Sequence, residues 1–331
     1  MKAKFSVPFN GDLALVKEAL SSGRVSEVYF ALPGRRSGAS DHFVLPGGVD
    51  AAYGPLLPAL ARICAGFGVR TNLLCNAPSL ALTPLTGIFA AAKALKVASI
   101  TLADPLFIDK FRRALPEVAL QASVIMNLRS EERVRQMLRA GVGTLTLAAE
   151  VNRDLPLLRR IKKLKAEFPG FKVKLMANYY CGYDCVFMNA HYLSGMFGGR
   201  GTSAAGGGCF FRGGDAAEGI RRPFIRPEDI GLYVKDRLAD EFKLIARYQA
   251  SSVLRKIYAA YFRGKFGGDL GELLGGKAGD YAKSQMCYMD NSLFPKGFAG
   301  KVGACDKNCA SCGYCRRVFG RVTAGSRRRN E

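Results

Sequence analysis

The chain has 331 residues, of which 49% are hydrophobic and 23% are charged. These values are ordinary for a globular protein and exclude a collagen-like or wholly disordered chain. No run reaches about 18 consecutive apolar residues and the start of the chain lacks a signal-peptide pattern, so we expect a cytoplasmic protein without a transmembrane segment. Lys and Arg outnumber Asp and Glu by 49 to 27, a net charge of +22, which either serves solubility or favours RNA over an acidic membrane surface as a partner.

Short apolar runs that suit β-strands alternate with helix-like stretches along most of the chain. We expect strands at 4–8, 27–32, 69–75, 98–102, 119–125, 144–148, 171–177 and 241–245, and helices between them at 12–21, 55–66, 85–94, 107–115, 130–140, 155–167 and 227–238. Such alternation predicts parallel strands joined by crossover helices, and its length favours a (β/α)8 TIM-type barrel. A flavodoxin-like open sheet is the alternative, although it usually has fewer strands.

The predicted barrel occupies residues 1–250 and carries a first group of cysteines. A C-terminal helical extension and linker follow at 251–300, beginning with a helix at 251–263, and residues 301–331 form a Cys-rich tail with a basic terminus. In a (β/α)8 barrel the chemistry lies on the loops that follow the C-terminal ends of the strands.

The strongest local motif is the run Cys305, Cys309, Cys312 and Cys315 in the tail. Thiols this close cannot all form unstrained disulfides, but they can bind one metal centre. A single run of four cysteines is typical of ferredoxin-like ligation, whereas zinc sites usually contain two Cys-x-x-Cys pairs further apart. The tail therefore predicts a [4Fe-4S] cluster, with structural zinc as the alternative.

A second group of cysteines follows the seventh expected strand. Cys181 and Cys185 are four residues apart and Cys209 lies further along a Gly-rich segment. Cys287 and Cys75 are the candidates for a fourth ligand. A [4Fe-4S] cluster with three thiolates and one open iron is also possible, as are free thiols without a metal.

Isolated residues with reactive side chains are weaker signals. His42 follows the second expected strand and His191 follows Cys185, so both are candidates for catalysis, although a lone His is more often structural. Cys64 lies within a helical pattern and is expected to pack in the core.

Lys243 and Arg247 lie at the eighth expected strand and are candidates for catalysis or for binding an anionic cosubstrate or phosphate. The alternative is an ion pair with Glu228 or Asp229. The basic helix at 155–167 is a further candidate for phosphate contacts, or a solvated helix face.

One family has the same local patterns. The segment Arg222-Pro-Phe-Ile-Arg-Pro-Glu-Asp-Ile-Gly-Leu-Tyr233, and then Asp240-Glu-Phe-Lys-Leu-Ile-Ala-Arg247, resemble peptidase family U32, the collagenase-like family. The strand at 27–32 is similar to that family's second strand, and Cys181 stands where the family has its first cluster cysteine. The resemblance covers roughly residues 4–263.

The resemblance implies a barrel fold and, as in several branches of the family, a [4Fe-4S] cluster on the cysteines after the seventh strand. Those branches act in oxygen-independent hydroxylation of ubiquinone precursors, of transfer RNA and of ribosomal RNA, and a related family member as heterodimer partner is one expectation. The chain departs from the family pattern Phe-Lys-Ile-Glu-Gly-Arg, because Ile245 replaces the acid. The fourth cysteine expected shortly before 227–229 is missing, and Arg221 and Arg222 are nearby instead.

Three functions follow from these patterns. The first is an iron-sulfur enzyme, with two clusters expected, that modifies RNA or another aromatic substrate by oxygen-independent hydroxylation. The second is a collagenase-like peptidase, for which no Ser/His/Asp or HExxH signature is present. The third is a non-enzymatic iron-sulfur scaffold or accessory subunit. The sequence does not indicate the substrate or the electron donor.

Overall fold

A computed structural model describes residues 2–32, 53–81, 83–190, 192, 217–274 and 288–324. Eight parallel strands pair in chain order, and β8 pairs with β1, so the sheet is a closed barrel. The strands are β1 (Phe5–Pro8), β2 (Val25–Phe30), β3 (Arg70–Cys75), β4 (Ser99–Leu102), β5 (Ala119–Ala122), β6 (Thr144–Thr146), β7 (Lys172–Met176) and β8 (Glu241–Lys243). The predicted (β/α)8 barrel is confirmed, and the open sheet is wrong.

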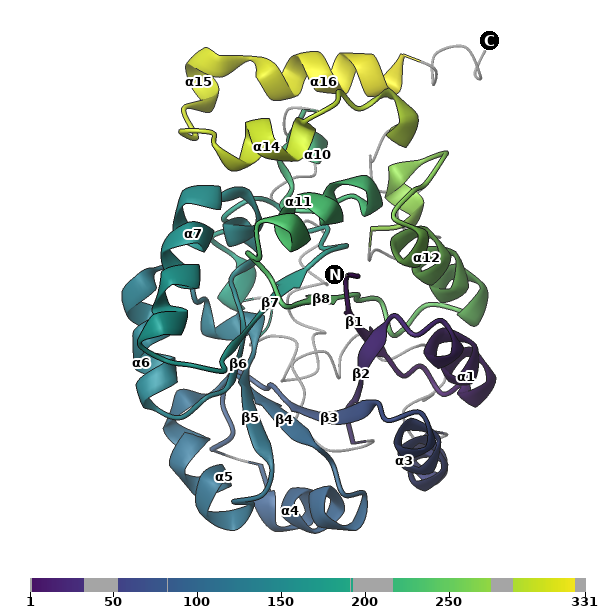
Figure 1. Ribbon diagram of the computed structural model, residues 1–331, viewed down its shortest axis with the longest axis vertical. Coiled ribbons are helices and arrows are strands. Elements are labelled where there is room, and N and C mark those ends of the chain that lie inside the picture. The colour runs from purple at the N-terminus through teal and green to yellow at the C-terminus, as the bar shows by residue number, and fades with distance from the viewer. Residues whose placement is uncertain are drawn as a thin grey trace.

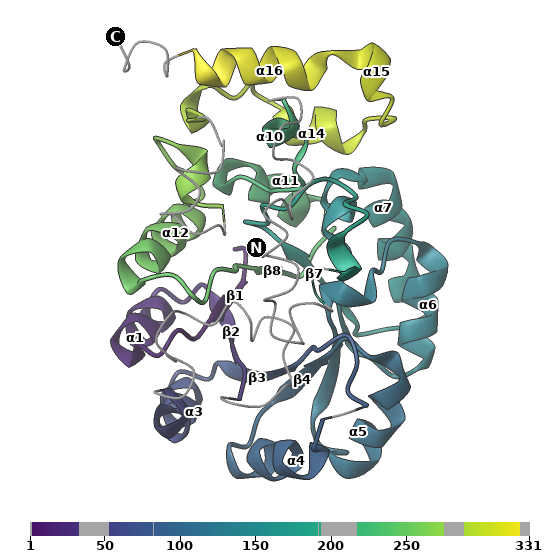
Figure 2. The ribbon, with the colours of Figure 1, turned by 180° about the vertical axis from the view of Figure 1, so that it is seen from behind.

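Helices surround this barrel on its outer side (Figures 1 and 2). They are α1 (Leu13–Ser21), α3 (Leu57–Gly66), α4 (Leu85–Ala94), α5 (Ile108–Ala114), α6 (Glu131–Arg139), α7 (Leu155–Lys163), α11 (Ile230–Lys235) and α12 (Ser251–Arg263). Helix α12 packs against α1, so it completes the ring of helices next to β8. Within the described ranges, every helix is too short or too polar to cross a membrane.

Local side-chain contacts explain where several of these elements begin. Asp12 accepts hydrogen bonds from the N–H groups of Ala14 and Leu15 and so caps α1, and Ser130 caps α6 in the same way. The strand expected at 119–125 ends early because Ser123 accepts from Ile125 and starts a 3-10 turn, Val124–Met126.

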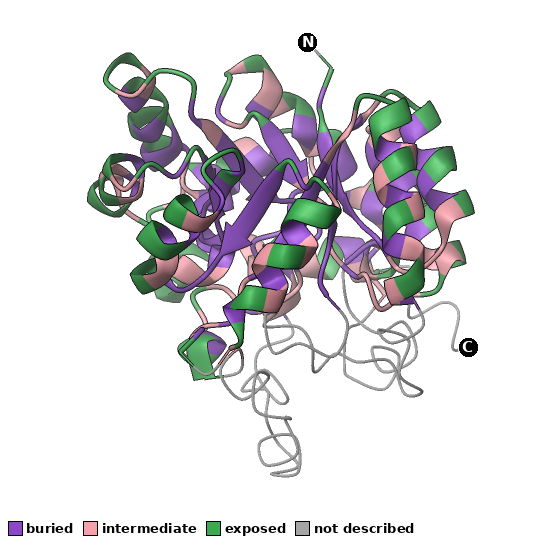
Figure 3. Cartoon of the chain, turned by 90° about the horizontal axis from the view of Figure 1, so that it is seen from below, coloured by how far each residue is buried: buried purple, intermediate pink, exposed green. Residues whose placement is uncertain are grey.

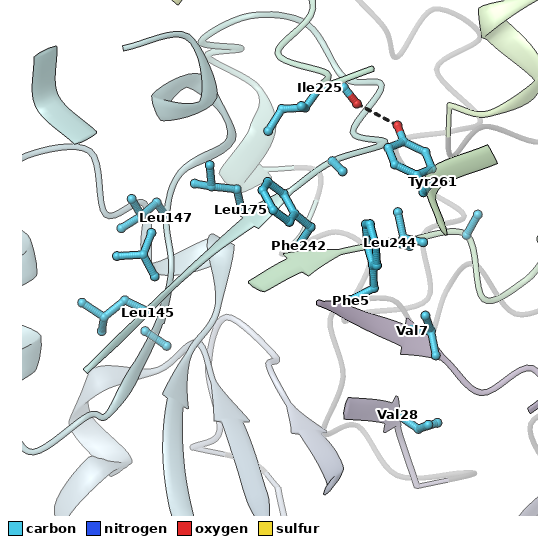
Figure 4. Packing of buried hydrophobic residues seen from close by; sticks show 14 of the residues in the cluster. Phe5, Val7, Val28, Leu145, Leu147, Leu175, Ile225, Phe242, Leu244 and Tyr261 are labelled. Atoms are coloured by element: carbon cyan, nitrogen blue, oxygen red, sulfur yellow. Dashed lines mark hydrogen bonds between the residues drawn. The ribbon is translucent and has the colours of Figure 1, made fainter. Parts of the chain in front are cut away.

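The core lies between the outer side of the sheet and the helices. The strands are buried and the helices expose their outer faces, as Figure 3 shows. Phe5, Phe242 and Leu244 pack together there (Figure 4), and the Tyr261 hydroxyl of α12 donates a 2.8 Å hydrogen bond to the Ile225 carbonyl. This contact fixes α12 to the segment that precedes α11.

Two cysteines belong to this core. Cys64 is fully buried in α3, and burial raises the pKa of its thiol to about 12, so the expected core role is confirmed. Cys75, at the end of β3, is also fully buried and packs in the same apolar cluster as Leu73. Its thiol therefore lies in the layer between sheet and helices.

The tail folds as three helices beside the barrel, at the top of Figure 1. These are α14 (Phe298–Gly303), α15 (Cys309–Cys312) and α16 (Tyr314–Thr323). Helix α16 packs against α10 (Glu218–Arg221), while α14 packs against α7 and against the 3-10 turn Ala149–Arg153 that follows β6. Val318 and Val322 are buried and anchor α16.

Candidate functional site

The inner side of the barrel is polar and charged, whereas bulky branched apolar residues usually fill this space. The Lys174 Nζ atom lies 2.6 Å from Glu27 Oε1, and both side chains are almost completely buried, with 2% and 1% exposed. Gln121 accepts from Lys174 and donates to Glu27, and Ser6 donates to Glu27 at 2.7 Å. Side chains of β1 and β5 therefore supply further hydrogen bonds to this pair of β2 and β7.

The electrostatics of the pair favour its charged form. Burial alone would raise the pKa of Glu27, but the positive charge of Lys174 and the hydrogen bonds from Lys174, Ser6 and Gln121 lower it to about 2. A second inward carboxylate, Glu241 of β8, lies 3.4 Å from Lys174 and forms an ion pair with Arg70. Both carboxylates are thus neutralised by bases from other strands.

Lys243, the last residue of β8, differs from these bases. Its Nζ atom lies over the ring of Tyr29, 4.1 Å from the centroid, and the described part of the chain contains no carboxylate in an ion pair with it. Burial lowers the pKa of Lys243 to about 7; the nearby positive charges of Lys174 and Arg247 act in the same direction, and Glu27 opposes them. This lysine is therefore partly neutral near pH 7.

The expected alternative for Lys243 and Arg247, an ion pair with Glu228 or Asp229, is wrong. Asp229 accepts two hydrogen bonds from Arg226, at 2.7 and 2.9 Å. Glu228 accepts from the backbone of Phe266 at 2.7 Å and from Asn291 at 3.0 Å. Glu228 thus joins the segment before α11 to the C-terminal part of the chain, whereas Asp229 bonds within that segment.

The β8 segment that holds Lys243 continues through a strained residue. Ala246 has a φ of +93°, in the region that favours glycine. The U32 pattern quoted above has glycine at this position. Ala246 therefore occupies a backbone conformation for which its side chain is unsuited.

The four tail cysteines lie around one cavity of about 500 Å³, between the tail and the barrel. Cys309 and Cys312 are the first and last residues of α15, and Cys305 and Cys315 flank this helix. The four thiols therefore lie on one short segment of the chain. They share a cavity but not a common point, because no three Cys, His, Asp or Glu side chains in the described residues converge closely enough to hold a single metal ion.

Basic side chains predominate among the charged residues that line the cavity. They are Arg153, Arg221, Lys301, Lys307 and Arg316, against one carboxylate, Asp306. The Lys307 backbone N–H donates to Cys305 Sγ at 3.3 Å, and the Lys307 ammonium donates to the Arg153 carbonyl at 2.6 Å. Burial raises the pKa of the Cys315 thiol, whereas Arg153 and Arg221 act to lower it.

Arg153 lies at the barrel side of this cavity and is 4% exposed. Its guanidinium lies over the rings of Phe224 and Phe298, at 5.1 and 5.5 Å from the centroids. Burial lowers the pKa of Arg153 to about 10. Its Nε and Nη2 atoms have no hydrogen-bond partner in the described structure, so a buried cation faces the thiol cavity without a counter-charge.

The first cysteine group is only partly described. Cys181 packs beside the cluster of Met176 and Tyr179 after β7, and Cys185 is half-buried four residues later. Tyr183, between them, lines the tail cavity. The remaining predicted site residues lie outside the described residues: His42, His191, Cys209 and Cys287.

Sequence reasoning missed two features of the site. Arg153 carries no local signal, because its burial depends on Phe224 and Phe298, which are distant in sequence. The pair of Glu27 and Lys174 has a weak signal, because Lys174 lies between two apolar residues of a strand pattern and Glu27 precedes an apolar run. Charged residues at such inward positions indicate a polar barrel interior.

The molecule is thus a (β/α)8-barrel protein with a thiol-lined cavity in a C-terminal appendage. The model of peptidase family U32 matches residues 64–212. An uncharacterized protease of Methanocaldococcus jannaschii is 25% identical over 76% of this chain and 76% of its own length. The expected resemblance to peptidase family U32 is confirmed by these two matches.

Two solved structures are also similar. One is a U32 peptidase, with 12% identity, a TM-score of 0.49, and coverage of 73% of this chain and 92% of that one. The other is a mutant tryptophan synthase alpha-subunit of Pyrococcus furiosus, with 14% identity, a TM-score of 0.39, and coverage of 83% and 98%.

Proposed function

We propose that this chain is an iron-sulfur protein of the U32 type that acts in oxygen-independent, hydroxylation-type modification of RNA or another aromatic substrate. The observation that carries the proposal is the cavity that Cys305, Cys309, Cys312 and Cys315 line together. Cys thiolates are the usual protein ligands of 4Fe-4S clusters, and such clusters supply one-electron transfer when bound.

The charges around the cavity support an anionic occupant. A 4Fe-4S cluster with four thiolates carries net negative charge, and the side chains beside the thiols are mainly basic. Arg153 is the most informative of them, because a buried cation without a hydrogen-bonded counter-charge is costly unless something compensates it. The N–H of Lys307 at Cys305 Sγ also suits a cluster, since hydrogen bonds to the sulfurs set the potential.

A second cluster on Cys181, Cys185, Cys209 and Cys287 forms part of the proposal. The segment with Cys181 and Cys185 borders the tail cavity through Tyr183. Cys75 is disfavoured as a ligand because its side chain packs in the core between sheet and helices.

The net charge of +22 supports RNA as the substrate. The basic helix α7 contributes little specific support, since Arg159 and Arg160 have carboxylate partners at 3.9 and 3.8 Å. A related family member remains the proposed protein partner.

The test is quantification of iron, sulfide and zinc in protein purified without oxygen. Two clusters predict about eight irons and as many sulfides per chain, four per cluster. Cys309→Ser and Cys185→Ser should each lose about half of the iron. The matched control is Cys64→Ala, which removes a core thiol and should leave the iron content unchanged.

Other outcomes would redirect the proposal. Zinc without sulfide, lost only in Cys309→Ser, would make the tail a structural zinc site. Iron-free protein that cleaves casein, with cleavage lost in Cys181→Ser, would favour a peptidase. RNA that copurifies and is released by salt supports the nucleic-acid substrate.

A further inference from the structure

One buried base of the barrel lacks the partner that the others have. Lys174 pairs with Glu27, and Arg70 pairs with Glu241. Lys243 lies against the face of Tyr29 instead, and among the described residues it forms no ion pair or hydrogen bond through its ammonium group. The residue as a whole is half-buried, so part of its surface lies open to solvent.

The position of Lys243 is where (β/α)8 barrels carry their chemistry. It is the last residue of β8, at the C-terminal end of the strand, inside the ring of strands. Tyr29 is held in place because its hydroxyl donates a 2.8 Å hydrogen bond to the Leu244 carbonyl. The ring beneath the amine is therefore fixed, and in the described part of the chain the amine forms no ion pair with a carboxylate.

The charged groups around Lys243 come from three strands. Glu27 and Tyr29 face it from β2, Lys174 faces it from β7, and Arg247 follows on its own segment. Glu27 is already neutralised by Lys174. The positive charges of Lys174 and Arg247 lie near Lys243, which favours the unprotonated amine and an anionic substrate beside it.

We propose that the Lys243 amine is a nucleophile that forms an imine with the aldehyde or ketone group of a small anionic substrate at the barrel mouth. The neutral amine adds to the carbonyl carbon, the carbon–oxygen double bond is lost, and one water molecule leaves as the carbon–nitrogen double bond forms. The step is a condensation, so it requires no oxidant or reductant. It does not depend on bound iron.

A lysine with a purely structural role would be expected to resemble Lys174, which has a carboxylate at 2.6 Å and an amide oxygen at 2.9 Å. Lys243 has an aromatic face instead, and within the described residues no side chain accepts a hydrogen bond from its amine. This difference in contacts distinguishes the structural role of Lys174 from the reactive role that we propose for Lys243.

The test uses the full chain with glyoxylate, a small anionic aldehyde, as the probe. The imine is fixed by sodium borohydride, which donates hydride to the carbon–nitrogen double bond, and the modified lysines are located by peptide mass mapping. At pH 7 we expect Lys243 to be labelled at least about tenfold more than Lys256, an exposed lysine of α12 paired with Glu272 at 3.1 Å. Acetaldehyde, which lacks the carboxylate, should label Lys243 several-fold less.

Two variants accompany the labelling. Lys243→Arg keeps the positive charge and Lys243→Met removes it, and both should lose the adduct at this position while Lys256 is labelled as before. Labelling of Lys243 no greater than that of Lys256 in the folded wild-type protein would overturn the proposal, a result that needs no variant to fold. Equal labelling by acetaldehyde and glyoxylate would overturn the anionic substrate. Iron content is a separate measurement, so loss of the iron-sulfur function would be recognised independently.

Discussion

The barrel interior and the tail cavity both bury basic side chains, but they differ in how these are compensated. Lys174 meets Glu27 and Glu241 within the sheet, whereas Arg153 faces four thiols and two aromatic rings. Lys174 and its carboxylates are therefore balanced as folded, which indicates a structural role for this group, and Lys243 is the base of the interior that lies outside it. The tail cavity has an excess of positive charge, which is typical of a site that binds an anion.

The largest expected effect on stability comes from breaking the ion pair of Glu27 and Lys174. Lys174→Met leaves Glu27 buried without its cation, so we expect a loss of about 3–5 kcal/mol in the free energy of unfolding, measured with urea. The double variant Glu27→Leu, Lys174→Met should recover most of this loss, because it leaves no isolated charge.

Arg255→Ala serves as the control, since Arg255 and Glu18 form an exposed pair that water screens and that should contribute little to the free energy of unfolding. If the double variant were as unstable as Lys174→Met, charge balance would not explain the interior.

The same pair predicts a dependence on pH. The pKa of Glu27 is about 2 in the folded protein against an ordinary value of 4.5, so its ionised form stabilises the fold. This contribution is complete above pH 4.5 and is lost as pH falls from about 5 to about 2, in total on the order of 3 kcal/mol. The measurement is urea unfolding of the wild type and of Glu27→Gln across this range. The stability difference between the two proteins should shrink with acid, and a constant difference would contradict the prediction.

In the tail cavity, unlike in the barrel, removal of the buried cation should change the stability of the metal-free protein little. Arg153→Met removes a buried cation with unsatisfied nitrogens but also its contacts with two aromatic rings, so we expect the metal-free protein to change by no more than about 1 kcal/mol. The iron-loaded protein should instead release iron faster to a chelator. Arg153→Lys, which keeps the charge, should lie between the wild type and Arg153→Met. Equal release from all three proteins would show that Arg153 does not compensate an anionic occupant.

The smallest expected effect concerns the end of β8. Ala246→Gly removes the strain of a φ of +93°, and the gain is partly offset by the greater freedom of glycine in the unfolded chain. We expect a net increase of about 0.5–1 kcal/mol in the free energy of unfolding. A decrease would mean that the Ala246 methyl group contributes more through packing than the backbone loses through strain.

The sequence predicted the barrel well because each strand and helix carries its own apolar pattern. The helices at 85–94 and 251–263 have the expected bounds, since their ends coincide with the ends of the pattern. The tail helices were not predicted because α15 has four residues and Gly313, with a φ of +59°, separates it from α16. The grouping of the tail thiols followed from their spacing alone. Arg153 and the reactive setting of Lys243 depend on partners far along the chain, which periodicity does not reveal.

Lys307 gives the appendage a mechanical link to the sheet. One residue donates its backbone N–H to Cys305 and its side chain to the carbonyl of Arg153, at the end of the turn that follows β6. Lys307 therefore joins a thiol of the cavity wall to the barrel turn that holds Arg153, so this one residue, together with the packing of α14, holds the cavity wall against the barrel.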